Sequence, residues 1–178
     1  AGTFDGNNHT ITLSNGIASD GYVALFSRVT GTIKNLVVEG VIDSQGSNAV
    51  AGICASSYGG TFEHCVNKCI INSNTSSGTG GIVGYSDNDR ATTIKSCVNM
   101  GEISSSLSTI GGIVGTANPS SSITIENSIN LGKITGTSNV SGIFGLGSAS
   151  TQMITDCINI GEIKATGEIG YAAGIIIP

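Results

Sequence analysis

A unit of about 30 residues repeats along almost the whole chain, and this repetition limits the fold more strictly than any other feature of the sequence. The clearest copy, GGIVGYSDNDRATTIKSCVNMGEIS, begins at Gly80. It returns as GGIVGTANPSSSITIENSINLGKIT from Gly111 and as SGIFGLGSASTQMITDCINIGEIK from Ser141. Looser copies begin at Ala24 and Ala51, and 172–177 hold an incomplete one. Equivalent positions lie 28 to 32 residues apart, a period typical of solenoids whose units stack on one another.

Each copy contains a GIVG-type block, a turn, an IxxCVNxG block and a short strand around the next Ile. These pieces are rich in Ile and Val and are bounded by Gly, Ser and Asn, which is typical of strands, and no window has helical periodicity. We therefore predict an all-β fold, a right-handed parallel β-helix (β-solenoid) of about six coils of roughly 30 residues. One domain would span 1–178, with an opening half-coil at 1–23, five repeats at 24–171 and a truncated last coil at 172–178.

The signs of the charges support coils that stack in register. One column consists of Lys34, Glu63, Lys95, Glu126 and Thr155. A second consists of Val41, Ile70, Glu102, Lys133 and Glu162. In both columns the charges alternate in sign from one copy to the next. Stacked coils would hold such residues about 4.8 Å apart, where like charges repel, so alternation is expected only for parallel in-register stacking.

Other columns predict the interior and the bends. An asparagine column of Asn67, Asn99, Asn130 and Asn159 is expected to bond to itself and to backbone at a corner. Two apolar columns are expected to fill the core: Ile33, Phe62, Ile94, Ile125 and Ile154, and Val37, Val66, Val98, Ile129 and Ile158. A glycine column is expected to adopt positive φ at a turn: Gly40, Gly101, Gly132 and Gly161.

Three of the five cysteines, Cys65, Cys97 and Cys157, share one column with Leu36 and Ser128. We expect small buried side chains there. A disulfide between Cys65 and Cys97 is the alternative, although side chains stacked in parallel suit that bond poorly. No Cys-x-x-Cys motif or partner His favours metal binding, and we predict no cofactor.

Composition and charge narrow the partners. The net charge of −5 and seven scattered basic residues argue against nucleic acid. No apolar run reaches 18 residues, so we expect no membrane insertion. Charged residues make up only 11% of the chain, which predicts a neutral exterior of Ser, Thr, Asn and Gly.

No catalytic constellation is evident, and we predict that the chain is not an enzyme. The acidic residues occur about once per coil beside a basic residue, which keeps carboxylates ionised. His9 and His64 are expected to have structural roles. Asp87-Asn88-Asp89 has oxygen ligands suited to Ca²⁺, but neighbouring copies lack them, so a solvated turn is expected. Three sequons place candidate N-glycosylation sites at Asn8, Asn74 and Asn139.

The GGIVG block followed by IxxCVNxGxI is similar to the GLUG repeat family, in the copies from Gly80, Gly111 and Ser141 and more loosely in those from Ala24 and Ala51. The opening GTFDGNNHTITL also resembles the segment that often precedes such repeats. Members occur in large secreted or surface-anchored proteins of bacteria and some protists, including adhesin-like proteins and non-catalytic regions of immunoglobulin A peptidases. The resemblance implies an extracellular stalk or binding module with no catalytic residues to transfer.

The leading hypothesis is therefore a non-enzymatic extracellular or cell-surface module, adhesin-like, with a host or cell-surface glycan or protein as partner. A second hypothesis is a structural subunit that polymerises end to end through open solenoid ends. A third is a carbohydrate-binding or carbohydrate-processing β-helix, with a cleft formed by the loops around Tyr58, Tyr85 and 87–90. Ice binding by the Thr column is disfavoured, because a charged column lies beside it.

Overall fold

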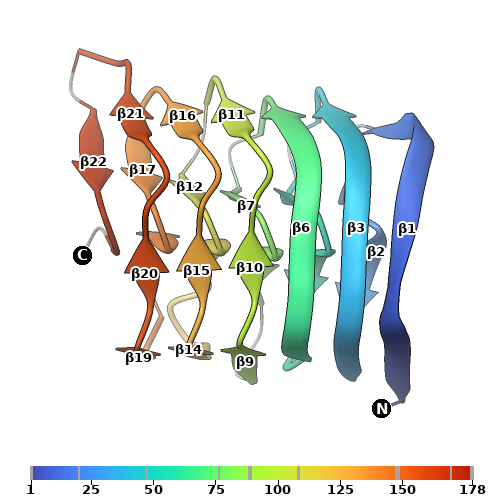
Figure 1. Ribbon diagram of the computed structural model, residues 1–178. Helices are drawn as coiled ribbons and strands as arrows, with labels where there is room; N and C mark the ends of the chain where they lie inside the picture. Colours follow the sequence, from blue (N-terminus) through green and yellow to red (C-terminus); the bar gives the residue numbers. More distant parts are fainter. Residues whose placement is uncertain are drawn as a thin grey trace.

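The computed structural model describes residues 2–19, 21–46, 48–75, 77–87, 90–107, 109–146, 149–168 and 170–176. These residues form 22 strands and no helix, and every strand pair in the three sheets is parallel. Figure 1 shows the coils stacked side by side, with the N-terminus at one end of the stack and the C-terminus at the other. The prediction of an all-β parallel solenoid is confirmed.

The largest sheet, sheet A, supplies one long side of every coil. Its strands are β1 (Thr3–Ser19), β3 (Thr32–Ser44), β6 (Thr61–Ser73), β9 (Ala91–Lys95), β10 (Val98–Asn99), β11 (Ile103–Ser105), β14 (Ser122–Glu126), β15 (Ile129–Asn130), β16 (Ile134–Gly136), β19 (Thr151–Thr155), β20 (Ile158–Asn159) and β21 (Ile163–Ala165).

Two smaller sheets close each coil. Sheet B contains β4 (Val50–Ala51), β7 (Thr79–Gly80), β12 (Ile110–Gly111), β17 (Asn139–Ser141) and β22 (Tyr171–Ala173). Sheet C contains β2 (Phe26–Val29), β5 (Cys54–Ser57), β8 (Val83–Ser86), β13 (Val114–Ala117) and β18 (Phe144–Leu146).

The number of coils is close to the six predicted. Sheets B and C have five strands each, while sheet A has six layers. Isolated bridges at Val23 and Ile176 begin a further layer of sheets B and C, respectively. In Figure 1 the chain rises along the front strands, returns behind them and advances toward the C-terminus, which is the right-handed sense.

The charged columns lie in register. Lys34 pairs with Glu63, which pairs with Lys95, and the column extends to Asp5 at its N-terminal end and to Glu126 beyond Lys95. Ion pairs join Lys34 to Asp5 at 3.3 Å, Lys95 to Glu126 at 3.4 Å and Lys133 to Glu162 at 3.1 Å. Because these side chains are largely exposed, each pair is worth at most about 1 kcal/mol. Alternation therefore chiefly avoids the repulsion of stacked like charges.

One polar column bends sheet A through an unusual backbone conformation. Asn35, His64, Ser96, Asn127 and Asp156 all have φ between 50° and 52°. Short polar side chains tolerate this left-handed conformation better than branched apolar ones, which explains the residue types of the column. His64 is one of these bend residues and is exposed, in keeping with a structural role.

This bend reverses the expected direction of one apolar column. The Val37, Val66, Val98, Ile129 and Ile158 column was predicted to be buried, but its members are half-buried or, at Ile158, 51% exposed. Strand alternation after the bend instead points the cysteine and asparagine columns on either side into the core. The Ile33 column is buried from Ile33 to Ile125 and half-buried at Ile154.

The asparagines form a buried ladder. Asn67 Nδ2 donates to Asn99 Oδ1, Asn99 Nδ2 to Asn130 Oδ1 and Asn130 Nδ2 to Asn159 Oδ1, each at 2.7 Å. Asn99, Asn130 and Asn159 also donate to the carbonyl oxygen two residues later, at 3.0, 2.9 and 3.1 Å. Asn67, Asn99 and Asn130 are fully buried. Their hydrogen bonds offset the cost of placing amides in the core.

The GIVG block is a corner, where a single strand was predicted. In the clearest copy β7 ends at Gly80 and β8 begins at Val83, so Gly81 and Ile82 form the bend between sheets B and C. A Cβ atom on Gly81 would lie 2.3 Å from the Gly112 carbonyl oxygen and 2.6 Å from Asn99 Oδ1. Glycine is needed here because the next coil and the asparagine ladder both approach closely.

The second glycine column also serves close approach, and the prediction of positive φ holds only at Gly40, whose φ is 130°. At Gly101 a Cβ atom would lie 1.9 Å from the Cys69 carbonyl oxygen, and at Gly132 it would lie 2.0 Å from that of Gly101. Cys69 itself lies within the unbroken strand β6, with its side chain buried. The chain therefore accepts a side chain at that layer.

We expect Asn130→Ala to lower the free energy of unfolding by about 2–4 kcal/mol, because it removes three side-chain hydrogen bonds and leaves buried partners unsatisfied. Urea unfolding followed by circular dichroism measures the loss. Asn72→Ala, at an exposed position of the same sheet, is the matched control and should cost less than about 0.5 kcal/mol. Equal losses in the two variants would show that the ladder does not carry this stability.

Candidate functional site

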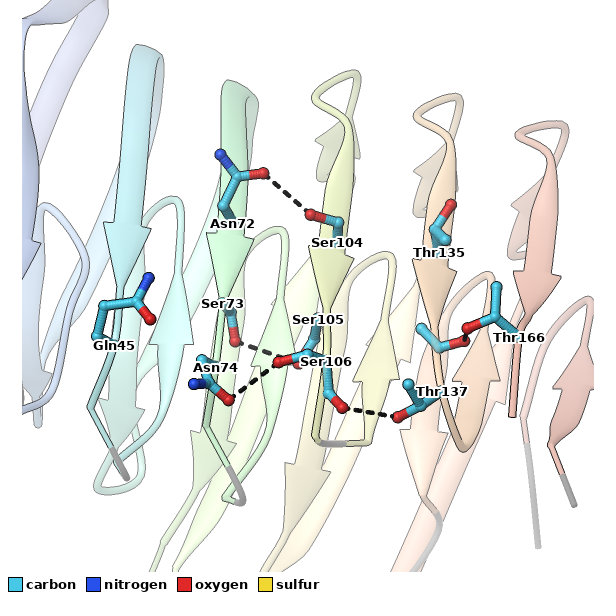
Figure 2. A pocket seen from close by; sticks show the side chains of 11 residues that line it. Gln45, Asn72, Ser73, Asn74, Ser104, Ser105, Ser106, Thr135, Thr137 and Thr166 are labelled. Atoms are coloured by element: carbon cyan, nitrogen blue, oxygen red, sulfur yellow. Dashed lines mark hydrogen bonds between the residues drawn. The ribbon is translucent and has the colours of Figure 1, made fainter. Parts of the chain in front are cut away.

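An open groove crosses the corner where sheet A meets sheet B (Figure 2). It has a volume of about 400 Å³, within the range of about 300–1,000 Å³ found for ligand pockets. Its lining residues are polar or small: Gln45, Asn72, Ser73, Asn74, Ser104, Ser105, Ser106, Thr135, Gly136, Thr137 and Thr166. They come from five successive layers of sheet A, so the groove runs along the solenoid axis.

Strand alternation and in-register pairing create the groove. Asn72 pairs with Ser104, and Ser104 with Thr135, so one outward column runs across β6, β11 and β16. The next residue of each strand turns inward, and Ser73 and Ser105 are accordingly buried. The following residue faces outward again, which gives a second column of Gln45, Asn74, Ser106, Thr137 and Thr166. The groove lies between these two columns.

Hydrogen bonds between neighbouring coils hold the groove side chains in place. Ser104 Oγ donates to Asn72 Oδ1 at 3.0 Å, and Ser106 Oγ donates to Asn74 Oδ1 at 2.9 Å. Thr137 Oγ1 donates to the Ser106 carbonyl oxygen at 3.0 Å. Figure 2 shows the amide nitrogens of Asn72 and Asn74 pointing away from these hydroxyls. Both amides therefore keep their donors directed toward the open side.

The chemistry of the groove is hydrogen bonding between neutral groups. None of its lining residues is ionisable. The lining can donate and accept hydrogen bonds, but it supplies no group suited to general acid–base or nucleophilic catalysis at neutral pH. The groove is therefore suited to binding.

The sequence reasoning did not identify the groove. Its residues follow the short Ile strand in the segments DSQ, NSN, SSS, TGT and KAT, which begin at Asp43, Asn72, Ser104, Thr135 and Lys164. Read as columns, these segments have polar residues at the first and third positions in every coil. That regularity is the signal that an alignment of the copies contains, although only the fold shows that the two columns flank a groove.

The loops where a carbohydrate cleft was predicted form an aromatic–arginine cluster. The guanidinium carbon of Arg28 lies 4.7 Å from the centre of the Tyr22 ring and 5.3 Å from that of Tyr58. A hydrogen bond with Tyr22 raises the pKa of Arg28 above its ordinary value, and a hydrogen bond with Asp87 raises that of Tyr58. The interactions within this cluster engage the aromatic faces and the carboxylate with one another.

Metal and membrane features were also compared with the fold. Among the described residues no three His, Cys, Asp or Glu side chains converge as metal ligands would, and Asn88 and Asp89 of the predicted loop lie outside that part of the chain. The same described part of the chain also has no helix with the length and hydropathy needed to cross a membrane.

The cysteines are free thiols, and four of them are buried. Burial, together with contact with Cys65, raises the pKa of the Cys97 thiol well above its ordinary value. Burial likewise raises the pKa of Cys69 to about 12 and that of Cys157, which is only half-buried, above its ordinary value. The thiols of Cys65, Cys97 and Cys157 donate to backbone carbonyls of their own coil and of the preceding one.

The three sequon asparagines differ in exposure. Asn8 is exposed and has φ of 61°. Asn74 is half-buried and lines the groove, and Asn139 is half-buried in β17. Glycosylation at these residues stays a prediction, and a glycan at Asn74 would cover the groove.

The exterior is less uniformly polar than the composition predicted. Met100, Leu131 and Ile160 form an outward column that is 43–71% exposed. It lies one strand position beyond the asparagine ladder, beside the half-buried Val98 and Ile129. Strand alternation therefore leaves an apolar stripe on both sides of an internal polar ladder.

Comparison with known proteins supports the fold. The chain is similar to the crystal structure of a putative immunoglobulin A1 protease from Bacteroides ovatus, with a TM-score of 0.71, 20% sequence identity, and coverage of 97% of this chain and 68% of that one. At this identity the likeness shows the β-solenoid fold alone. No protein-family model matches the sequence, and no curated protein does. The relation to the GLUG family therefore rests on the motifs.

We expect only Cys157 to react rapidly with a thiol reagent in the native protein at pH 8, because the other four thiols are buried. Absorbance with Ellman's reagent should show about one reactive thiol before denaturation and five after it. Cys157→Ser, which copies Ser128 of the preceding coil, should abolish the native reaction. Rapid native labelling of Cys65 or Cys97, or a mass lower by two hydrogens from a disulfide between them, would contradict this arrangement.

Proposed function

We propose that the chain is a non-enzymatic module that acts outside the cell or on its surface, as a stalk or an adhesin-like binding domain. The observation that carries this proposal is the groove, which presents amide and hydroxyl groups over five layers and has no ionisable lining residue. A rigid stack of coils with binding groups at its surface is a suitable form for a module that holds or extends a contact.

The charged residues support a role without catalysis. The carboxylates of Asp5, Glu126 and Glu162 are paired with lysines of neighbouring coils. Hydrogen bonds from the Asn7 backbone and the Asn35 amide, together with Lys34, lower the pKa of Asp5. Carboxylates in such surroundings stay ionised at neutral pH and make poor general acids.

Labelling of intact cells that produce the protein tests the location. We expect an antibody against the folded module to bind unpermeabilised cells or to detect the protein in the medium. Brief protease treatment of intact cells should remove any surface signal while an internal marker protein survives. A signal that appears only after permeabilisation would contradict the extracellular assignment. Cleavage of immunoglobulin A1 by the purified chain would contradict the non-enzymatic one.

A second candidate, end-to-end assembly, is favoured by the residues at the two ends of the stack. Phe4 pairs with Ile33 and is 40% exposed, while Ile154 pairs with Ile125 and is half-buried. In a head-to-tail stack of two copies, Ile154 of one copy would lie above Phe4 of the next. Both side chains would then be buried as the rest of their column is.

Analytical ultracentrifugation over a wide range of concentrations tests this assembly. If copies stack, the wild-type protein forms oligomers at high concentration, and Ile154→Lys lowers the association by at least tenfold because it would bury a charge. Ile160→Lys, at an outward position that is 71% exposed, is the matched control and should leave association unchanged. Wild-type protein that remains monomeric throughout would eliminate this candidate.

A further inference from the structure

We propose that the groove between the two polar columns of sheet A is a binding site for a neutral oligosaccharide that lies along the solenoid axis. This inference rests on the proposed binding function and names the class of ligand. It also moves the expected carbohydrate site from the tyrosine loops to the opposite end of the coil cross-section, where the groove residues of β6, β11 and β16 meet the corner (Figure 2).

The shape of the groove favours an extended chain of several units. It runs from Gln45 to Thr166 through five layers, and four steps of about 4.8 Å give a length of about 19 Å. The same kinds of group recur at each step, because the columns repeat with the coils. A polymer with a regular spacing of hydroxyl groups can use such a row, whereas a single small molecule would meet only part of it.

The hydrogen-bonding groups match a polyhydroxyl ligand. Asn72 and Asn74 use their carbonyl oxygens to accept from Ser104 and Ser106, which fixes the direction of both amides. Their NH₂ groups are then donors, while the serine oxygens and Thr135 Oγ1 can accept. Sugar hydroxyls both donate and accept, so they can satisfy each of these groups in turn. Preorganised donors and acceptors also lower the entropy cost of binding.

Other ligand classes fit the groove less well. A polyanion meets no lysine or arginine among the lining residues, and the chain as a whole has a net charge of −5. A peptide that adds a strand needs an open sheet edge, but β6, β11 and β16 are each paired on both sides. An apolar ligand would leave the amides and hydroxyls without partners.

Nuclear magnetic resonance of the unglycosylated, isotope-labelled chain provides the test, because it reports the Asn72 and Asn74 side-chain amides directly. The probes are cellohexaose, maltohexaose, mannohexaose and N-acetylchitohexaose, with hexagalacturonate as the charged comparison. We expect at least one neutral probe to bind saturably and to shift these two amide signals and the backbone signals of 104–106 and 135–137. Without an aromatic platform in the groove, the Kd should be about 0.1–1 mM.

Two variants test the site without altering the core. Asn72→Asp keeps the acceptor for Ser104 but removes both donors, and it should weaken binding about tenfold. Thr135→Val removes one hydroxyl at a strand position that suits Val, and it should weaken binding about threefold. Asn127→Asp is the matched control, because it makes the same charge change at an exposed bend position where the next coil already has Asp156. Its affinity should equal that of the wild type.

The outcomes separate this inference from the proposed function. Neutral probes that fail to bind at their solubility limit, or that bind with full affinity to Asn72→Asp and Thr135→Val, overturn the groove as a glycan site. Stronger binding of hexagalacturonate than of every neutral probe overturns the assignment to neutral glycans. If cell labelling places the protein outside while these probes fail, only the inference falls. If the protein is internal, the proposed function falls even when a probe binds.

Discussion

The asparagine ladder inside the coils is the interaction on which the rest of the structure depends. Each amide bonds to the one above and to a carbonyl of its own bend, so every coil is fixed in height and in rotation relative to the next. The ladder also explains the glycines of the other block. A Cβ atom on Gly52 would lie 2.0 Å from Asn67 Oδ1, and one on Gly112 would lie 2.5 Å from Asn130 Cγ. The two motifs of the repeat are thus the two sides of one packing contact.

Because the ladder and the apolar columns fix the stack from within, the exterior is free to vary. Stacked charges only have to alternate, as they do from Asp5 to Glu126, and their ion pairs contribute little to stability. Outward positions elsewhere carry three different surfaces: the neutral groove at Asn72 and Ser104, the arginine between two tyrosines at Arg28, and the apolar stripe at Met100. One repeat therefore supports several kinds of surface on a common scaffold.

The predictions that succeeded depend on position alone, and those that failed depend on direction. The pairing of Lys34 with Glu63 follows from aligning the copies, and so does the pairing of Asn99 with Asn130. The direction of Val98 does not, because the bend at Ser96 has φ of 51° and resets which side chains point inward. Likewise Gly101 was expected at a positive φ, but only the coil below, whose Cys69 carbonyl lies where a Cβ atom would be, explains the glycine.

The sequence by itself determined the solenoid, its parallel register and the identity of nearly every column, because a stacked repeat converts spacing along the chain directly into neighbours in space. It did not determine which columns meet across a corner. The groove joins Asn72 with Asn74 across an inward residue and joins both with the serines of the next coil, and these contacts exist only after the chain has bent and stacked. The tertiary structure decided the location of the candidate site, because the angles of the bends are set by packing between coils and are not encoded in the period of the repeat.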